Sequence, residues 1–87
     1  MITRKSVEKL IYPFAFVEKF LNEKSDYFFT KEEIYAEVPK DEDGVPLITI
    51  SQMETALRYL SRSQVIVCEY VKGVRHFGAN LEEHRHY

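Results

Sequence analysis

The stretch RYLSRSQVIVCEYVKGVRHF, residues 58–77, changes from helical spacing to the composition of a β-strand within a few residues. Its second half is rich in Val, Ile, Tyr and Phe, which favour strands. The break at Lys72-Gly73 suits a two-residue hairpin turn, because glycine accepts the positive φ that such a turn requires. Such a turn sets two cross-strand pairs, Cys68 with Phe77 and Tyr70 with Arg75, unless the register is shifted by one residue. The stretch therefore predicts the end of a helix followed by a β-hairpin.

Two capping-box patterns place helices upstream of this hairpin. Thr30–Glu33 (TKEE) and Ser51–Glu54 (SQME) each combine a hydroxyl at the N-cap with a Glu three residues later. The first pattern predicts a helix over residues 31–38, which Pro39 stops. The second predicts a helix over residues 52–63.

The helix predicted over residues 52–63 has a narrow apolar stripe and a polar outer face at 100° per residue. The stripe contains Met53, Ala56, Leu57 and Leu60. Arg58, Arg62 and Thr55 lie almost opposite the stripe, and Gln52, Glu54 and Tyr59 flank them. The outer face therefore offers long hydrogen-bond donors.

A further helix is predicted in PFAFVEKFLNEKSD, with Pro13 at its first helical position. Phe14, Val17, Phe20 and Leu21 form an apolar face wider than one core contact needs. Residues 3–12 either continue this helix with a kink at Pro13 or form a separate arm. We expect the excess apolar surface to join two copies of the chain, through residues such as Leu10, Phe14 and Phe16.

Two connecting segments complete the predicted order of elements. DYFFT, residues 26–30, is short and aromatic and predicts a short strand. PKDEDGVPLITI, residues 39–50, contains two prolines and a glycine and predicts an exposed loop. The loop carries three adjacent acids, Asp41, Glu42 and Asp43. Asp41 and Asp43 with Gly44 faintly resemble a calcium-binding loop, but the spacing is short and the closing Glu is missing.

The overall composition limits the possible classes of protein. The 87 residues suit one small domain, and the net charge of −2 is not that of a generally basic nucleic-acid binder. Residues 51–79 nevertheless carry four Lys or Arg against two Glu, a local balance of +2. The single cysteine and the lack of a signal-peptide pattern or a membrane-spanning apolar run predict a cytoplasmic protein.

The order helix, strand, helix, helix, strand, turn, strand resembles the winged-helix family. The resemblance is carried by FTKEEIYAEV and ITISQMETALRYLSRSQVIVCEYVKGVRHFG, and it covers residues 12–79. Residues 1–11 are then an N-terminal arm or helix extension, and residues 80–87 a polar tail. One departure is the connector after Val38, which is longer and more acidic than the short turn of typical members.

The resemblance implies an α+β fold of three helices, a short strand and a C-terminal hairpin wing. It further implies a transcriptional regulator that reads double-stranded DNA with its third helix and wing. The excess apolar face of the first helix adds the expectation of a homodimer, since specific sites usually need two half-sites. Arginine forks match guanine edges or phosphate oxygens, and Gln, Thr and Tyr reach bases or phosphates. The implied contact residues are Gln52, Thr55, Arg58, Tyr59, Arg62, Lys72 and Arg75, with the acidic loop away from the DNA.

Simpler interpretations accompany these expectations. Glu54 and Arg58 have the spacing of a surface ion pair, and Arg75 beside Tyr70 has the spacing of a cation–π contact. His76, His84, His86 and Cys68 lack the paired spacing of a metal site, so we expect no metal or other cofactor. No catalytic motif is present, and we expect no enzyme activity. The alternative function is a winged-helix module that binds protein instead of DNA.

Overall fold

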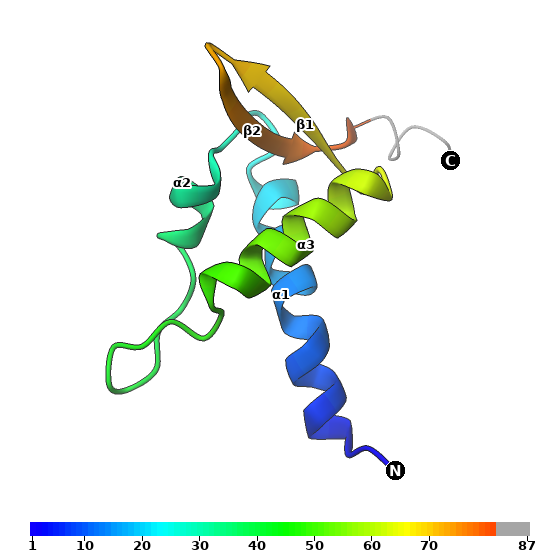
Figure 1. Cartoon of the computed structure of the whole chain (residues 1–87), viewed down its shortest axis with the longest axis vertical. Helices are drawn as coiled ribbons and strands as arrows, with labels where there is room; N and C mark the ends of the chain where they lie inside the picture. Colours follow the sequence, from blue (N-terminus) through cyan, green and yellow to red (C-terminus); the bar gives the residue numbers. More distant parts are fainter. Residues whose placement is uncertain (82–87) are drawn as a thin grey trace.

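The computed structural model describes residues 1–81, which form an α+β fold (Figure 1). Within that range the elements are α1 (Arg4–Glu23), α2 (Lys31–Tyr35), α3 (Ile50–Arg62), β1 (Ile66–Val71) and β2 (Val74–Ala79). The two strands form an antiparallel hairpin. In this part of the chain, no helix has the length and apolar character needed to cross a membrane.

The core lies where α2, α3 and the base of the hairpin meet the C-terminal half of α1. Its fully buried side chains come from every one of these segments, and they include Leu21, Ile34, Met53 and Ile66. The predicted apolar stripe of α3 is confirmed, since all four of its residues are buried. The acidic loop leaves the body at the opposite end from the hairpin (Figure 1).

The predicted hairpin register is confirmed, with Cys68 opposite Phe77 and Tyr70 opposite Arg75. Both turn residues have positive φ, 52° at Lys72 and 79° at Gly73. This combination is the twist-matching turn of two-residue hairpins.

The strand predicted at residues 26–30 is reduced to one bridge between Phe29 and Phe77. Phe29 N donates to Phe77 O at 2.9 Å, and Phe77 N donates to Phe29 O at 2.7 Å. The pairing stops there because Thr30 is already the N-cap of α2. Its predicted capping box is confirmed, with Thr30 Oγ1 accepting from Glu33 N at 3.2 Å.

Two predicted helix boundaries are wrong. The capping box of α3 uses Thr49 and Gln52, not Ser51 and Glu54, so the helix begins two residues earlier. Gln52 Oε1 accepts from Thr49 N at 2.8 Å, which closes the box. Helix α2 ends at Tyr35 because the next amides tighten into a turn, where Val38 N donates to Tyr35 O at 3.1 Å.

Pro13 lies inside α1, so its predicted place at the first helical position is wrong. Residues 4–12 continue the helix, which Thr3 caps by accepting from Ser6 N at 3.2 Å. Of the residues predicted to join two copies, Leu10 is 68% exposed, whereas Phe14 and Phe16 are half-buried against the core. The exposed apolar surface of α1 therefore lies nearer the N-terminus of the helix than Phe14 and Phe16.

Candidate functional site

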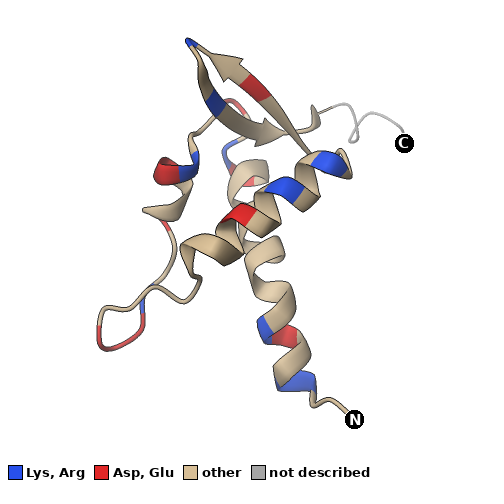
Figure 2. Ribbon diagram, in the orientation of Figure 1, with Lys and Arg blue, Asp and Glu red and all other residues tan. Residues whose placement is uncertain are grey.

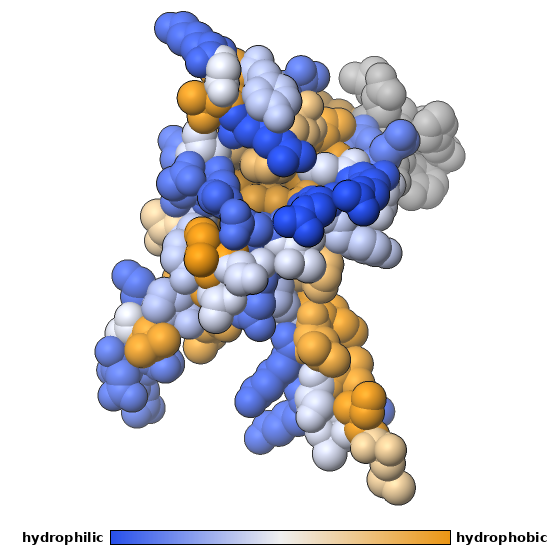
Figure 3. All heavy atoms as spheres, in the orientation of Figure 1, coloured by the Kyte–Doolittle hydropathy of each residue, from blue (hydrophilic) through white to orange (hydrophobic). Residues whose placement is uncertain are grey.

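A cleft of about 370 Å³ separates the hairpin from α2 and α3. Figure 3 shows hydrophilic surface over the C-terminal half of α3 and over the hairpin, with an apolar hollow between them. The residues that line the cleft are Lys31, Glu32, Glu54, Leu57, Arg58, Gly73, Val74, Arg75 and Phe77. The cleft thus combines an apolar floor with cations from three separate elements.

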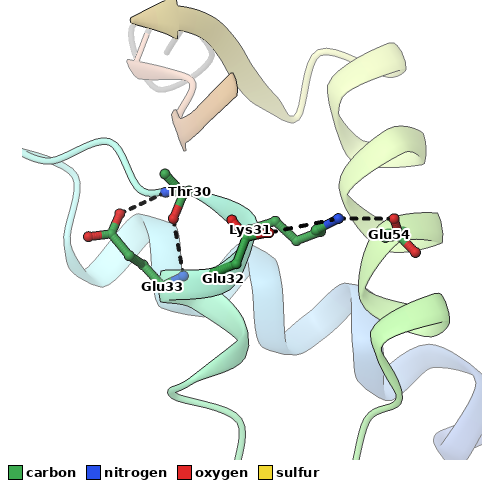
Figure 4. Close-up of polar contacts among 5 residues, drawn as sticks. All are labelled: Thr30, Lys31, Glu32, Glu33 and Glu54. Carbon is green, nitrogen blue, oxygen red and sulfur yellow. Dashed lines mark hydrogen bonds and ion pairs between the residues drawn. The ribbon is translucent and has the colours of Figure 1, made fainter. Parts of the chain in front are cut away.

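One carboxylate of the cleft is paired by a neighbouring helix. Lys31 Nζ, at the start of α2, contacts Glu54 Oε2 on α3 at 3.1 Å (Figure 4). It lies 3.9 Å from Glu32 Oε2 as well. The predicted pairing of Glu54 with Arg58 does not form, and the carboxylate of Glu54 contacts Lys31 instead. Arg58 keeps a charge that Glu54 does not compensate by direct contact.

Arg75 is held against the face of the hairpin by two contacts. Its Nε donates to Cys68 Sγ at 3.0 Å. Its guanidinium lies 5.2 Å from the centroid of the Phe77 ring, so the cation–π contact predicted with Tyr70 forms with Phe77 instead. The hydrogen bond to Cys68 raises the pKa of Arg75 above its ordinary value, and the group stays charged.

Three further cations continue this surface on α3 and the hairpin (Figure 2). Arg58 and Arg62 are exposed on the outer side of α3, and Lys72 is exposed at the turn of the hairpin. Within residues 1–81, none of the three forms a hydrogen bond or an ion pair through its side chain. Their donors are available to a ligand.

The remaining predicted site residues lie toward α1. Tyr59 is 60% exposed and meets the Phe14 ring edge-on, with centroids 5.5 Å apart. Thr55 borders a hollow between α3 and α1. The side-chain oxygen of Gln52 accepts from Thr49 N in the cap of α3, so a two-bond contact with adenine would compete with the cap. The structure brings Arg58 and Arg75 to one cleft, and it leaves Gln52 outside.

Sequence reasoning did not identify Lys31 and Phe77 as part of this site. The capping box at Thr30 places Lys31 in the first turn of α2, but only the packing of α2 on α3 brings it to Glu54. The confirmed register pairs Phe77 with Cys68. Phe77 also lies on the same face of the hairpin as Arg75, because the two residues are two positions apart in β2. The alternation of side chains along a strand could therefore have predicted that Phe77 lies beside Arg75 in the cleft.

Asp41, in the loop compared with a calcium-binding loop, has a structural role within the chain. Asp41 Oδ1 accepts from Asp43 N and from Val45 N, both at 2.9 Å, and so builds the turn of the acidic loop. In the described part of the chain, no group of three His, Cys, Asp or Glu is placed to hold a metal ion. His84 and His86 lie outside the described residues.

Comparisons with models of known protein families, with curated proteins and with solved structures found no significant match.

Proposed function

We propose that this chain is a winged-helix protein that binds duplex DNA, with α3 in the major groove and the β1–β2 hairpin along the phosphates. One observation carries the proposal. Arg58 on α3 and Arg75 on the hairpin border the same cleft, although they are far apart in the sequence. Surface charge that served only solubility would not require cations from two separate elements to lie beside one cleft.

The dimensions of α3 support this proposal. A helix of 13 residues is about 20 Å long and about 10–12 Å across, which matches the width of the major groove of B-DNA. The stripe of buried residues fixes α3 to the core, so its outer face is presented without rearrangement. Its cap is satisfied within the chain, so a ligand does not need to complete it.

The charge distribution supports the same orientation. Lys31 pairs Glu54, the one carboxylate of α3, and thereby limits its repulsion of phosphate. The acidic loop projects away from the hairpin (Figure 2). The proposed contacts are Arg58, Arg62, Lys72 and Arg75, with Thr55 and Tyr59 at the margin. Four cations that each neutralise one phosphate give a salt slope of about −3 to −4.

The test measures fluorescence anisotropy of a labelled duplex of mixed sequence over a series of salt concentrations. Lys72→Ala should weaken binding to all sequences and reduce the salt slope by about one. Arg58→Ala should weaken binding by about 1–3 kcal/mol and relax the preference at one base pair if it reads guanine. Lys19→Ala, a charge loss on the exposed side of α1, is the matched control and should change neither quantity.

The outcome that removes the proposal is a protein that shifts no duplex at low salt while remaining folded. The second candidate function, a module that binds protein, is favoured by the exposed apolar residues of the hairpin. Tyr70 is 70% exposed, and Val71 and Val74 beside it are exposed as well. That candidate predicts partner binding that tolerates salt and is lost when Tyr70 is changed to Ser.

A further inference from the structure

The N-terminal half of α1 carries apolar side chains that its own chain does not cover. It projects from the body of the molecule (Figure 1), and Figure 3 shows apolar surface continuing along it. Val7 is 39% exposed, Leu10 68% and Ile11 53%. Their spacing of three and four residues places them on one side of the helix. Farther along α1, Val17 and Leu21 of the same helix are fully buried in the core.

This projecting segment has little to stabilise it within one chain. A helix of nine residues is marginal in water without tertiary contacts. Pro13 cannot donate the helical hydrogen bond to the carbonyl of Lys9, so it weakens the connection to the rest of α1. A partner that buries the apolar side would supply the missing stabilisation.

Two flanks of the segment already face parts of the same chain. The N-terminal end of α3 borders the hollow beside Leu10, and the acidic loop borders the hollow beside Lys5 and Lys9. The side of α1 between these flanks carries the exposed residues Arg4, Val7, Ile11, Ala15, Glu18 and Asn22. We call this side the Ile11 face.

The charges of the Ile11 face identify its partner. Arg4 lies seven residues before Ile11, and Glu18 lies seven residues after it, so all three share one line along the helix. We propose that the Ile11 face binds the same face of a second copy, antiparallel and centred on Ile11. Each Arg4 then lies opposite the partner's Glu18, and the two-fold axis makes that ion pair twice. A parallel arrangement would instead set Arg4 against the partner's Arg4.

The size of the face sets the expected affinity. Residues 4–18 span about 22 Å of helix, which offers less than the roughly 800 Å² per partner of a typical specific interface. We therefore expect a dissociation constant on the order of 10 µM, not nanomolar. The inference does not rest on the proposed DNA binding, because sedimentation without DNA tests it.

Sedimentation equilibrium of the full chain from low to high micromolar concentration provides the test. The unchanged protein should form dimers. Arg4→Glu and Glu18→Arg should each weaken the dimer about tenfold or more, because each variant turns two attractions into two repulsions. The double variant Arg4→Glu/Glu18→Arg should restore dimerisation. Lys9→Glu, an equal change of charge on the flank toward the acidic loop, should leave the dimer intact.

The variants are expected to remain folded, and their folding is measured separately. Position 4 begins α1, where Glu interacts favourably with the helix dipole, so Arg4→Glu does not weaken the helix. Circular dichroism of each variant, Glu18→Arg included, should show the helical signal of the unchanged protein. A chain that stays monomeric to about 500 µM overturns the proposal. A dimer that ignores the single reversals, or that the double variant does not restore, overturns it equally.

Discussion

Gly78 is the position at which one added methyl group tests the packing most directly. It lies in β2 under the ring of Phe28, and a Cβ at this position would meet three ring carbons at 3.0 Å each. Carbon atoms prefer about 3.5–4.0 Å, and compression to 3.0 Å costs roughly 1 kcal/mol per contact before any relaxation. Alanine is favoured over glycine in a strand by about 0.5–1 kcal/mol. The clash is the larger of the two effects.

The ring of Phe28 is partly exposed, so it relieves part of the clash by moving outward. Overpacking of this kind costs about 1–3 kcal/mol. We therefore expect Gly78→Ala to lower the free energy of unfolding by about 1 kcal/mol net. The melting temperature should fall by about 4–8 °C for a chain of this size. Urea unfolding followed by circular dichroism measures the change.

A double-mutant cycle isolates the contact between the two residues. In the background of Phe28→Ala the clash is absent, and Gly78→Ala should become stabilising by about 0.5–1 kcal/mol. The sign of the effect thus inverts between the two backgrounds. The same effect in both backgrounds, or a rise in the urea midpoint of the single variant Gly78→Ala, would refute the assigned contact.

Two other changes test the cap of α3 and the acidic loop. Thr49→Ala should lower the free energy of unfolding by about 1 kcal/mol, because Gln52 N loses its acceptor, whereas Ser51→Ala should cost no more than about 0.5 kcal/mol. Equal losses in thermal melts of the two variants would contradict the assigned cap. Glu42→Ser/Asp43→Ser, which keeps Asp41 to hold the turn, should leave duplex affinity in the anisotropy assay unchanged or higher. A large loss of affinity would mean that the loop lies on the contact face.

The parts of the fold that depend on near neighbours in sequence were predictable. The hairpin register follows from the short turn at Gly73, because two turn residues leave little freedom in how the strands pair. The buried side of α3 follows from helical spacing, which placed Met53 and Leu60 inward without knowledge of their partners. The outward position of Arg58 followed from the same spacing.

The parts that depend on packing between distant segments were not predictable. Thr49 and Ser51 both precede a suitable partner three residues later, and the sequence contains no information that ranks them. The interior position of Pro13 depends on burial of that residue against the body, which overrides its preference for a helix start. The contact of Lys31 with Glu54 joins residues 23 positions apart and requires the packed pose of α2.

The bridge between Phe29 and Phe77 attaches the hairpin to the rest of the molecule near its base, and the turn has no such attachment among the described residues. On the side of β2 away from β1, two backbone hydrogen bonds tie Phe77 to the segment before α2. From Phe77 to the turn at Lys72, cross-strand pairing continues with β1. We therefore expect the hairpin to bend mainly between Phe77 and the turn at Lys72. Amide hydrogen exchange should be faster in that part of the hairpin than at Phe77. The turn of the hairpin is therefore free to adjust to a curved surface, while the two hydrogen bonds at Phe77 keep the base of the hairpin attached to the segment before α2.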